Sequence, residues 1–116
     1  MSAATDCVFC MIAAGDIPAT VVARTERVLA FRDLNPQAPT HVLVIPVDHQ
    51  PNAAATAAAD PAAIGEMVSL AAEVAVADGL AHGYRLVFNT GAEAGQSVFH
   101  THLHLLGGRG LGWPPG

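Results

Sequence analysis

Lysine is absent from this chain of 116 residues, and charge of either sign is sparse. The five basic residues are all arginines, and ten acidic residues give a formal net charge of −5 at pH 7. Without lysine the chain has neither a Schiff-base nucleophile nor the lysine of a phosphate-binding P-loop. A few scattered arginines on an acidic chain also fail to make the basic surface that binds nucleic acid, so we expect no nucleic-acid partner.

Long apolar runs are missing too. No stretch approaches the roughly 18 residues that a membrane-spanning helix needs, and the first basic residue, Arg24, comes too late for a secretion signal. We therefore expect a cytoplasmic protein with no membrane partner. The content of 52% hydrophobic and 13% charged residues nevertheless predicts a packed core, and the length suits one domain over residues 1–116.

The spacing of apolar residues and turn signals predicts five strands and two helices. The predicted strands cover 20–25, 28–32, 41–46, 84–89 and 98–106; a short helix is capped by Asp6 and closed by Gly15, and a long helix runs from Asp60-Pro61 to Gly79. Residues 47–59 are predicted to be an irregular connection. Because consecutive strands are joined by short links, we predict an α+β fold with a five-stranded antiparallel sheet, one long helix and one short helix.

Three of the six histidines alternate in the segment His100-Thr101-His102-Leu103-His104. In a strand, alternate side chains share one face, which places the three imidazoles together. Successive histidines would then lie about 6.6 to 7 Å apart, too far for all three to bind one zinc ion. A neutral imidazole can attack a phosphoryl group while a protonated neighbour offsets phosphate charge. The pattern therefore favours catalysis by the imidazoles over a surface strand that happens to carry histidines.

The loop at 89–97 comes directly before these histidines and contains small residues, an amide and a hydroxyl. Its glycines allow backbone N–H groups to approach an anion closely. An ordinary turn is the alternative interpretation of this loop taken alone.

His-x-His-x-His followed by two apolar residues resembles the signature of the histidine-triad (HIT) family of nucleotide hydrolases and transferases. Four segments are similar to its Hint branch: FRDLNPQAPTHVLVIP (31–46), GYRLVFNTG (83–91), GQSVFHTHLHLLGGR (95–109) and WPPG (113–116). The resemblance covers nearly the whole chain. It implies a homodimeric hydrolase that cleaves purine nucleoside 5′-phosphoramidates through a covalent nucleotidyl-histidine intermediate and needs no cofactor for catalysis.

The resemblance also implies catalytic roles for five residues. His102, the middle histidine, would be the nucleophile, with its Nδ1 bonded to the backbone carbonyl of His100. His104 would bind the α-phosphate, and His41 would complete a proton relay. Ser97 would hold the phosphate and the leaving group.

The substrate-binding residues that the resemblance implies hold the phosphate, the ribose and the base. They are Asn89, Gly95, Gln96 and Ser97 for the phosphate and leaving group, Asp33 beside Leu34 for the ribose hydroxyls, Phe9, Ile12, Ile17 and Phe31 for an apolar purine slot, and Trp113 in a tail that reaches toward the partner subunit. Plain hydrophobic core is the alternative interpretation of the four slot residues.

Cys7 and Cys10 are the only cysteines, and a disulfide between them would close too small a loop to stabilise a domain. A structural zinc ion needs four ligands. The resemblance to bacterial HIT proteins and uridylyltransferases implies that His49 and His100 complete such a site. A redox pair is the alternative, but no strand precedes the motif as in thioredoxin-like proteins.

Two other functions remain open. One is a dinucleoside polyphosphate hydrolase or a nucleotidylyl transferase, although the uridylyltransferase relatives carry Gln where this chain has His104. The other is a non-catalytic adaptor that binds nucleotide or zinc. Thr101 and Gly112 depart from the family pattern, in which these positions are usually aliphatic and often histidine, respectively, and Gly112 leaves the leaving-group selectivity open.

Overall fold

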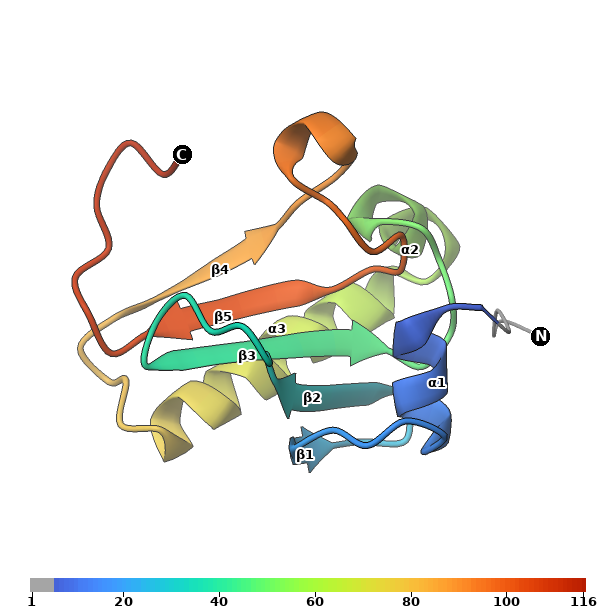
Figure 1. The fold of residues 1–116 in the computed structure, drawn as a ribbon, viewed down its shortest axis with the longest axis horizontal. Helices are drawn as coiled ribbons and strands as arrows, with labels where there is room; N and C mark the ends of the chain where they lie inside the picture. Colours follow the sequence, from blue (N-terminus) through green and yellow to red (C-terminus); the bar gives the residue numbers. More distant parts are fainter. Residues whose placement is uncertain (1–5) are drawn as a thin grey trace.

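A computed structural model describes residues 6–116 as one five-stranded antiparallel sheet with helices on both faces (Figure 1). The strands are β1 (Val21–Arg24), β2 (Val28–Arg32), β3 (Thr40–Pro46), β4 (Tyr84–Phe88) and β5 (Leu103–Gly107), in the sheet order β1-β2-β3-β5-β4. The helices are α1 (Val8–Ala14), α2 (Ala53–Ala59), α3 (Pro61–Ala77) and the short 3₁₀ helix η1 (Ala92–Ala94). The α+β class and the antiparallel sheet are therefore confirmed.

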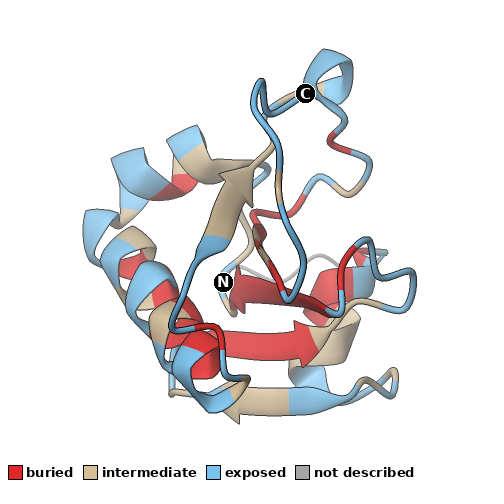
Figure 2. Ribbon diagram, turned by 90° about the vertical axis from the view of Figure 1, so that its left-hand side faces the viewer, coloured by how far each residue is buried: buried red, intermediate tan, exposed pale blue. Residues whose placement is uncertain are grey.

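The two faces of the sheet pack against different helices. Alternate residues of a strand point to opposite faces, and β2 and β3 are buried on both. One face joins α3 in an apolar cluster of Val28, Ala30, Val42, Val44, Met67, Leu70, Ala71, Val74, Ala75, Leu80, Leu103 and Leu105. The other joins the N-terminal segment in a smaller cluster of Cys7, Phe9, Cys10, Leu29, Phe31, Leu43 and Ile45. Figure 2 shows this buried layer in red on the central strands and on the sheet-facing side of α3.

The prediction of an irregular connection at 47–59 is wrong, because residues 53–59 form helix α2. The side chain of Asn52 caps this helix by accepting a hydrogen bond from the backbone N–H of Ala55 at 2.9 Å. Six of the seven helical residues are alanine, the best helix former. The remaining one, Thr56, is buried and anchors the helix. Residues 6–116 therefore form one long α-helix and two short ones, besides the 3₁₀ helix η1, in place of one of each.

The last strand begins later than predicted, at Leu103 and not at Val98. The register pairs Val44 of β3 with Leu103, so Pro46 lies where pairing would continue toward Thr101. Proline has no N–H to donate, which ends the ladder there. The backbone N–H of Thr101 donates instead to the carbonyl of Gln50 at 2.9 Å. His100 and His102 therefore lie in an irregular segment just before β5.

The predicted helix caps differ in two details. Helix α1 is capped by the Cys7 sulfur, which accepts from the backbone N–H of Cys10, and not by Asp6. Asp60 precedes α3 as predicted but makes no capping bond with its side chain, because its carboxylate pairs with Arg27. Gly15 closes α1 in the left-handed conformation, with φ 84°.

Thr101, the departure from the usual aliphatic residue, is only 1% exposed. Its hydroxyl lies 2.7 Å from that of Thr56, which joins α2 to the segment before β5. The buried hydroxyl is therefore satisfied. None of the helices formed by residues 6–116 combines the length and the apolar character that a membrane span requires.

Candidate active site

His102 is held with one ring nitrogen bonded and the other available. Its ring is 7% exposed, and its Nδ1 lies 2.7 Å from the backbone carbonyl of His100. A carbonyl oxygen can only accept, so Nδ1 must carry the hydrogen. In the neutral ring, Nε2 then has a free lone pair, which is the form that a nucleophile needs.

A chain of hydrogen bonds fixes the proton on His104 in the same way. The backbone N–H of Gln37 donates to His41 Nδ1 at 3.0 Å, so the hydrogen of neutral His41 is on Nε2. That nitrogen lies 2.9 Å from His104 Nδ1 and donates to it. Neutral His104 therefore carries its own hydrogen on Nε2. The two imidazoles of His102 and His104 lie 5.0 Å apart between ring centroids.

His104 Nε2 stands out in the part of the chain that the structure describes. It is the single buried side-chain nitrogen or oxygen there that makes no hydrogen bond. Burial, reinforced by His102 and His41, lowers the pKa of His104 to about 4, against a smaller opposing effect of Asp33. At neutral pH the free site therefore offers an uncharged N–H donor, and not an imidazolium, to an incoming anion.

Asp33 joins this group from the end of β2. One carboxylate oxygen lies 3.4 Å from His41 Nε2, and the other accepts from the backbone N–H of Asn35 at 2.8 Å. The pKa of His41 is lowered because burial outweighs the attraction of Asp33. Ligand atoms of Asp33, His41 and His104 lie within 4.8 Å of one another. The hydrogen bond between His41 and His104 and the 3.4 Å approach of Asp33 to His41 account for that proximity.

His102 and His104 open into a cavity of about 320 Å³, which we call the histidine cavity. This volume lies in the range of small-molecule sites. Nine of the predicted site residues line it: Phe9, Ile12, Ile17, Phe31, Asp33, Leu34, Ser97, His102 and His104. Six further residues line it that were not predicted from the sequence: Val8, Pro18, Ala19, Arg32, Leu43 and Val98. Val8 was within reach of sequence reasoning, since it lies four residues before Ile12 on the same helical face.

Four predicted substrate-binding residues, Gln96 among them, lie outside this cavity. Asn89 is half-buried just after β4, and Gly95 is exposed at the end of η1. Trp113 is 83% exposed in the C-terminal tail. Neither these residues nor the side chain of Gln96 is among those that line the histidine cavity.

The side chain of Gln96 is 4% exposed and holds the loop that carries Ser97. Its carbonyl oxygen accepts from the backbone N–H of Gly91 at 2.8 Å. Its amide nitrogen donates to the carbonyls of Pro51 at 2.6 Å and Val98 at 3.0 Å. All of these bonds are internal, so the Gln96 side chain shapes the loop and does not face the cavity. Sequence reasoning gave no sign of this role.

Cys7, Cys10, His49 and His100 form a second cluster, the Cys–His cluster, beside the histidine cavity. Their ligand atoms all lie within 4.8 Å of one another. The Nδ1 atom of His100 is 3.4 Å from the Cys7 sulfur, 3.5 Å from the Cys10 sulfur and 3.0 Å from Nδ1 of His49. Two sulfurs and two imidazole nitrogens are the donor set of a tetrahedral structural zinc site.

The protonation of His100 also suits a metal ligand. Its Nε2 lies 2.8 Å from the carbonyl of Pro46 and must donate to it, which leaves the lone pair on Nδ1, the nitrogen that faces the sulfurs. Burial lowers the pKa of His100 to about 4 against the hydrogen bond to the Pro46 carbonyl, which raises it, and His49 and His102 add smaller lowering effects. The residues present therefore fit zinc. The hydrogen bond from His100 Nε2 to the Pro46 carbonyl can stay in place when Nδ1 binds the metal.

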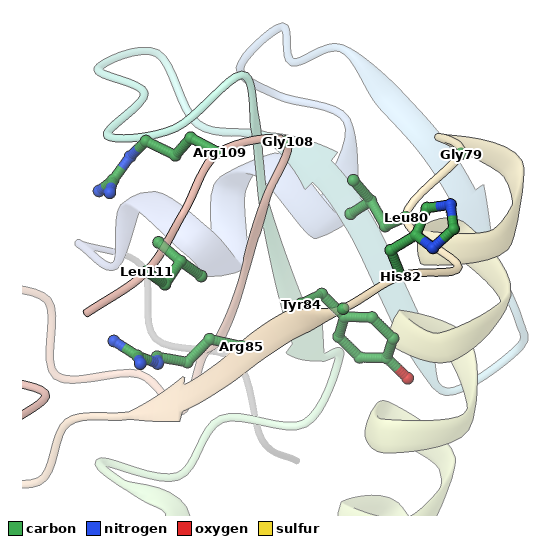
Figure 3. Close-up of a pocket in the computed structure, with 9 residues that line it drawn as sticks. Gly79, Leu80, His82, Tyr84, Arg85, Gly108, Arg109 and Leu111 are labelled. Carbon is green, nitrogen blue, oxygen red and sulfur yellow. The ribbon is translucent and has the colours of Figure 1, made fainter. Parts of the chain in front are cut away.

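Another cavity, of about 500 Å³, lies where β4 begins and β5 ends (Figure 3). It is lined by Gly79, Leu80, His82, Gly83, Tyr84, Arg85, Gly108, Arg109 and Leu111. Arg85 donates to the carbonyl of Gly112 and Arg109 to that of Gln37, so both arginines fasten loops. Figure 3 shows both pointing away from His82 and Tyr84. No residue of the histidine triad or of the Cys–His cluster lines this cavity.

Three alternating histidines beside a cavity of about 320 Å³ on an antiparallel sheet define the histidine-triad class. The HIT domain model matches residues 14–111, and the chain belongs to that family. It is 44% identical to the purine nucleoside phosphoramidase of Escherichia coli over 94% of this chain and 92% of that protein. It is 48% identical to a 14 kDa zinc-binding protein of Zea mays over 94% of this chain and 87% of that protein.

A solved structure, that of a HIT family hydrolase from Legionella pneumophila, superposes with a TM-score of 0.91. The two chains are 50% identical, and the match covers 96% of this chain and 100% of the other. The resemblance noted from the sequence is thereby confirmed, and the phosphoramidase relative supports the Hint branch.

Proposed function

We propose that the protein hydrolyses purine nucleoside 5′-phosphoramidates through a nucleotide covalently bound to His102. The observation that carries this proposal is the pairing, in one cavity, of a free lone pair on His102 Nε2 with an unpartnered N–H on His104 Nε2. A nucleophile beside a donor for the phosphate oxygen is the arrangement that phosphoryl transfer requires. The phosphoramidase named among the relatives supports the substrate class.

In the first step, His102 Nε2 bonds to the α-phosphorus as the bond from phosphorus to the leaving nitrogen breaks. The hydrogen bond from Nδ1 to the His100 carbonyl stabilises the positive charge that the substituted imidazole acquires. The leaving amine takes up a proton, and we assign its donation to the Ser97 hydroxyl that lines the cavity. Water then attacks the phosphorus and gives its proton to the Ser97 oxygen as the bond from His102 Nε2 to phosphorus breaks. This step releases the nucleoside monophosphate and restores both neutral His102 and the Ser97 hydroxyl.

The remaining cavity walls suit a nucleoside. Asp33 presents a half-buried carboxylate that can accept from both ribose hydroxyls. Phe9 and Phe31 pack edge to face, with ring centroids 5.7 Å apart, and with Ile12 and Ile17 they form an apolar wall. Such a wall favours a purine because the larger base buries more apolar surface.

The kinetic test uses adenosine 5′-phosphoramidate with the His102→Ala variant. Loss of the nucleophile should remove activity by at least roughly a thousandfold, because the triad acts as a unit. His82→Ala is the matched control, since His82 is exposed outside the histidine cavity. Unchanged turnover by His102→Ala would eliminate the mechanism.

The alternative substrates are distinguished by competition in one assay. Diadenosine tetraphosphate competes with the phosphoramidate, and the substrate with the higher kcat/KM is preferred. A preference for the polyphosphate would support the alternative that the protein is a dinucleoside polyphosphate hydrolase. Tight binding of AMP with neither turnover nor a covalent adduct would support the adaptor.

We also propose that the Cys–His cluster binds one structural zinc ion. The donor set, its burial and the tautomer of His100 support this, as does the zinc-binding name of the maize relative. Bound zinc would supply a cross-link between α1 and the segments that carry His49 and His100. Metal analysis of the wild type against a Cys7→Ser, Cys10→Ser variant tests it, and equal, near-zero metal in both would refute it.

We propose a homodimer built along β4. This strand is at an edge of the sheet, and its residues are exposed or half-buried in the single chain. Tyr84, Phe99 and Trp113 are large apolar side chains left 41%, 53% and 83% exposed. An open strand edge with apolar neighbours pairs readily with a second copy. Light scattering should give twice the mass of the chain; a monomeric mass at micromolar concentration would contradict the proposal.

A further inference from the structure

Helix α1 lies between the Cys–His cluster and the histidine cavity. Its capping residue, Cys7, and its third residue, Cys10, supply half of the cluster. Val8, Phe9 and Ile12 of the same helix line the cavity. A single seven-residue helix thus forms one side of the cluster and one wall of the cavity.

Apart from the Cys–His cluster, the helix is held by the packing of Phe9 and Cys10, with partly buried Ile12 and Ala13, on the apolar face of the sheet. An isolated helix of this length is unstable in water, so its position depends on packing and caps. Phe9 and Cys10 are the only residues within α1 that are buried. One of these two adjacent side chains belongs to the Cys–His cluster and the other contacts the nucleophile. Anything that fixes Cys10 therefore also fixes Phe9.

The ring of Phe9 contacts both histidines whose placement matters most. It packs edge to face on His102, with centroids 5.0 Å apart and planes at 79°, and on His100 at 6.0 Å and 80°. The bond from His102 Nδ1 to the His100 carbonyl holds one edge of the nucleophilic ring. Phe9 packs against the flank of that ring and limits its rotation.

We propose that Phe9 is a positioning residue that couples the Cys–His cluster to the nucleophile and to the nucleotide. A metal ion that cross-links Cys7 and Cys10 to His49 and His100 holds α1 against the sheet. Phe9 then stays against His102, and the wall of the cavity is formed before the nucleotide arrives. The proposal rests on the proposed function, because its ligand is a nucleoside monophosphate. Metal and nucleotide must then strengthen each other's binding by the same factor.

The first measurement is the affinity for AMP of the zinc-loaded and the zinc-stripped wild type, by calorimetry. We expect the stripped protein to bind AMP at least about fivefold more weakly, the lower end of usual coupling between sites. Zinc affinity, measured against a chromophoric chelator, should rise by the same factor when AMP is present. The amide of Met11, which donates to the Cys7 carbonyl within α1 at 3.0 Å, should exchange faster once zinc is removed.

Two variants separate positioning from general stability. Phe9→Ala should bind AMP weakly with or without zinc, and the milder Phe9→Leu should keep part of the zinc effect. Val74→Ala is the control, because Val74 is buried in α3 on the opposite face of the sheet. It should lose stability and keep the full zinc effect on AMP affinity.

The outcomes are distinguishable. Equal AMP affinity of the loaded and stripped wild type would overturn the coupling and leave the proposed function standing. A zinc effect that survives unchanged in Phe9→Ala would show that Phe9 does not carry it. Failure of the zinc-loaded protein to bind AMP at all would overturn the proposed function together with the coupling.

Discussion

The two faces of the sheet divide the work of this protein. The face under the 17-residue helix α3 buries an almost wholly aliphatic cluster, with Met67, Ala71, Val42 and Val44 fully buried. The face under the seven-residue helix α1 carries the cavity, the Cys–His cluster and two buried histidines. Apolar packing on one face therefore supports a face where buried polar groups, including an unpartnered N–H, lower stability.

The most direct test of this difference between the two faces is to remove the unpartnered N–H of His104. His104→Ala should lower kcat/KM for adenosine 5′-phosphoramidate by about a hundredfold to a thousandfold, the usual effect of losing one donor to a developing oxyanion. Thermal unfolding should change little, because the unsatisfied donor on Nε2 disappears with the side chain, while His41 Nε2, which loses its acceptor on His104, still has the Asp33 carboxylate 3.4 Å away. His82→Ala serves as the control for both measurements. A large fall in Tm with activity retained would reverse the roles that we assign to this face.

On the α3 face the expected effects are the opposite. Met67→Ala should cost about 2–5 kcal/mol of unfolding free energy, because it leaves a cavity in the fully buried cluster. The kcat of the folded protein should stay unchanged. Its neighbour Val68 is 39% exposed, so Val68→Ala is the matched control and should be nearly neutral. Denaturant unfolding beside steady-state kinetics checks both; a loss of kcat in folded Met67→Ala would show that the faces are not separate.

Substitutions in the loop that carries Ser97 should have intermediate effects on both activity and stability. Gln96→Ala removes three hydrogen bonds that hold this loop, and we expect about a tenfold loss in kcat/KM with about 1–2 kcal/mol of stability. Glu93→Ala is the control, since Glu93 is exposed in η1 of the same loop. A KM effect as large as the kcat effect would indicate substrate contact and would argue against a purely positioning role.

The smallest effect is expected at the carboxylate that closes α3. Arg32 donates to both oxygens of Asp78, at 2.5 and 2.9 Å, and this bond above all lowers the pKa of Asp78 below its ordinary value of 3.8. A lowered folded-state pKa stabilises the protein above the ordinary value, and this is lost as pH falls through the folded-state pKa. Asp78→Asn should therefore cost about 1 kcal/mol at pH 7, after allowing for solvent screening at the partly exposed Arg32.

The difference in unfolding free energy between the wild type and Asp78→Asn should shrink as pH falls. The wild type begins to lose this contribution below the ordinary pKa of 3.8 and loses the rest as pH falls through the lower folded-state pKa, so its stability should approach that of Asp78→Asn. Asp60→Asn is the control, because Asp60 and its partner Arg27 are each about half exposed, at 46% and 45% of the side chain. Urea unfolding at pH 7 and at a series of pH values below 3.8 measures both; a gap for Asp78→Asn that does not narrow as pH falls would exclude the carboxylate as its source.

The sequence predicted most of what depends on local pattern. Strand β2 has the predicted bounds, and the long apolar helix and the strand after the NPQAP loop are where periodicity places them. Helix α2 was missed because an alanine run has no apolar periodicity, and the Asn52 cap is a single weak signal. The early end of the β5 ladder depends on which residue faces Pro46, which only the register reveals.

The candidate site was likewise predictable where it depends on local sequence pattern, and not where it depends on contacts between distant segments. The triad pattern and the resemblance indicated His102, His104 and the four Cys–His residues, and the structure brings each group together. The bond from the Gln37 backbone that sets the tautomers of His41 and His104 lies outside any motif, since any residue supplies a backbone N–H. The inward turn of Gln96 likewise depends on loops that meet only in the folded chain.

The covalent step is the centre of this account, and mass spectrometry after rapid acid-free quenching of the reaction tests it most directly. During turnover of adenosine 5′-phosphoramidate, the peptide containing His102 should gain the mass of one adenylyl group, and the His102→Ala protein should gain none. Turnover without any adduct, or an adenylyl group attached to a different residue, would contradict the account.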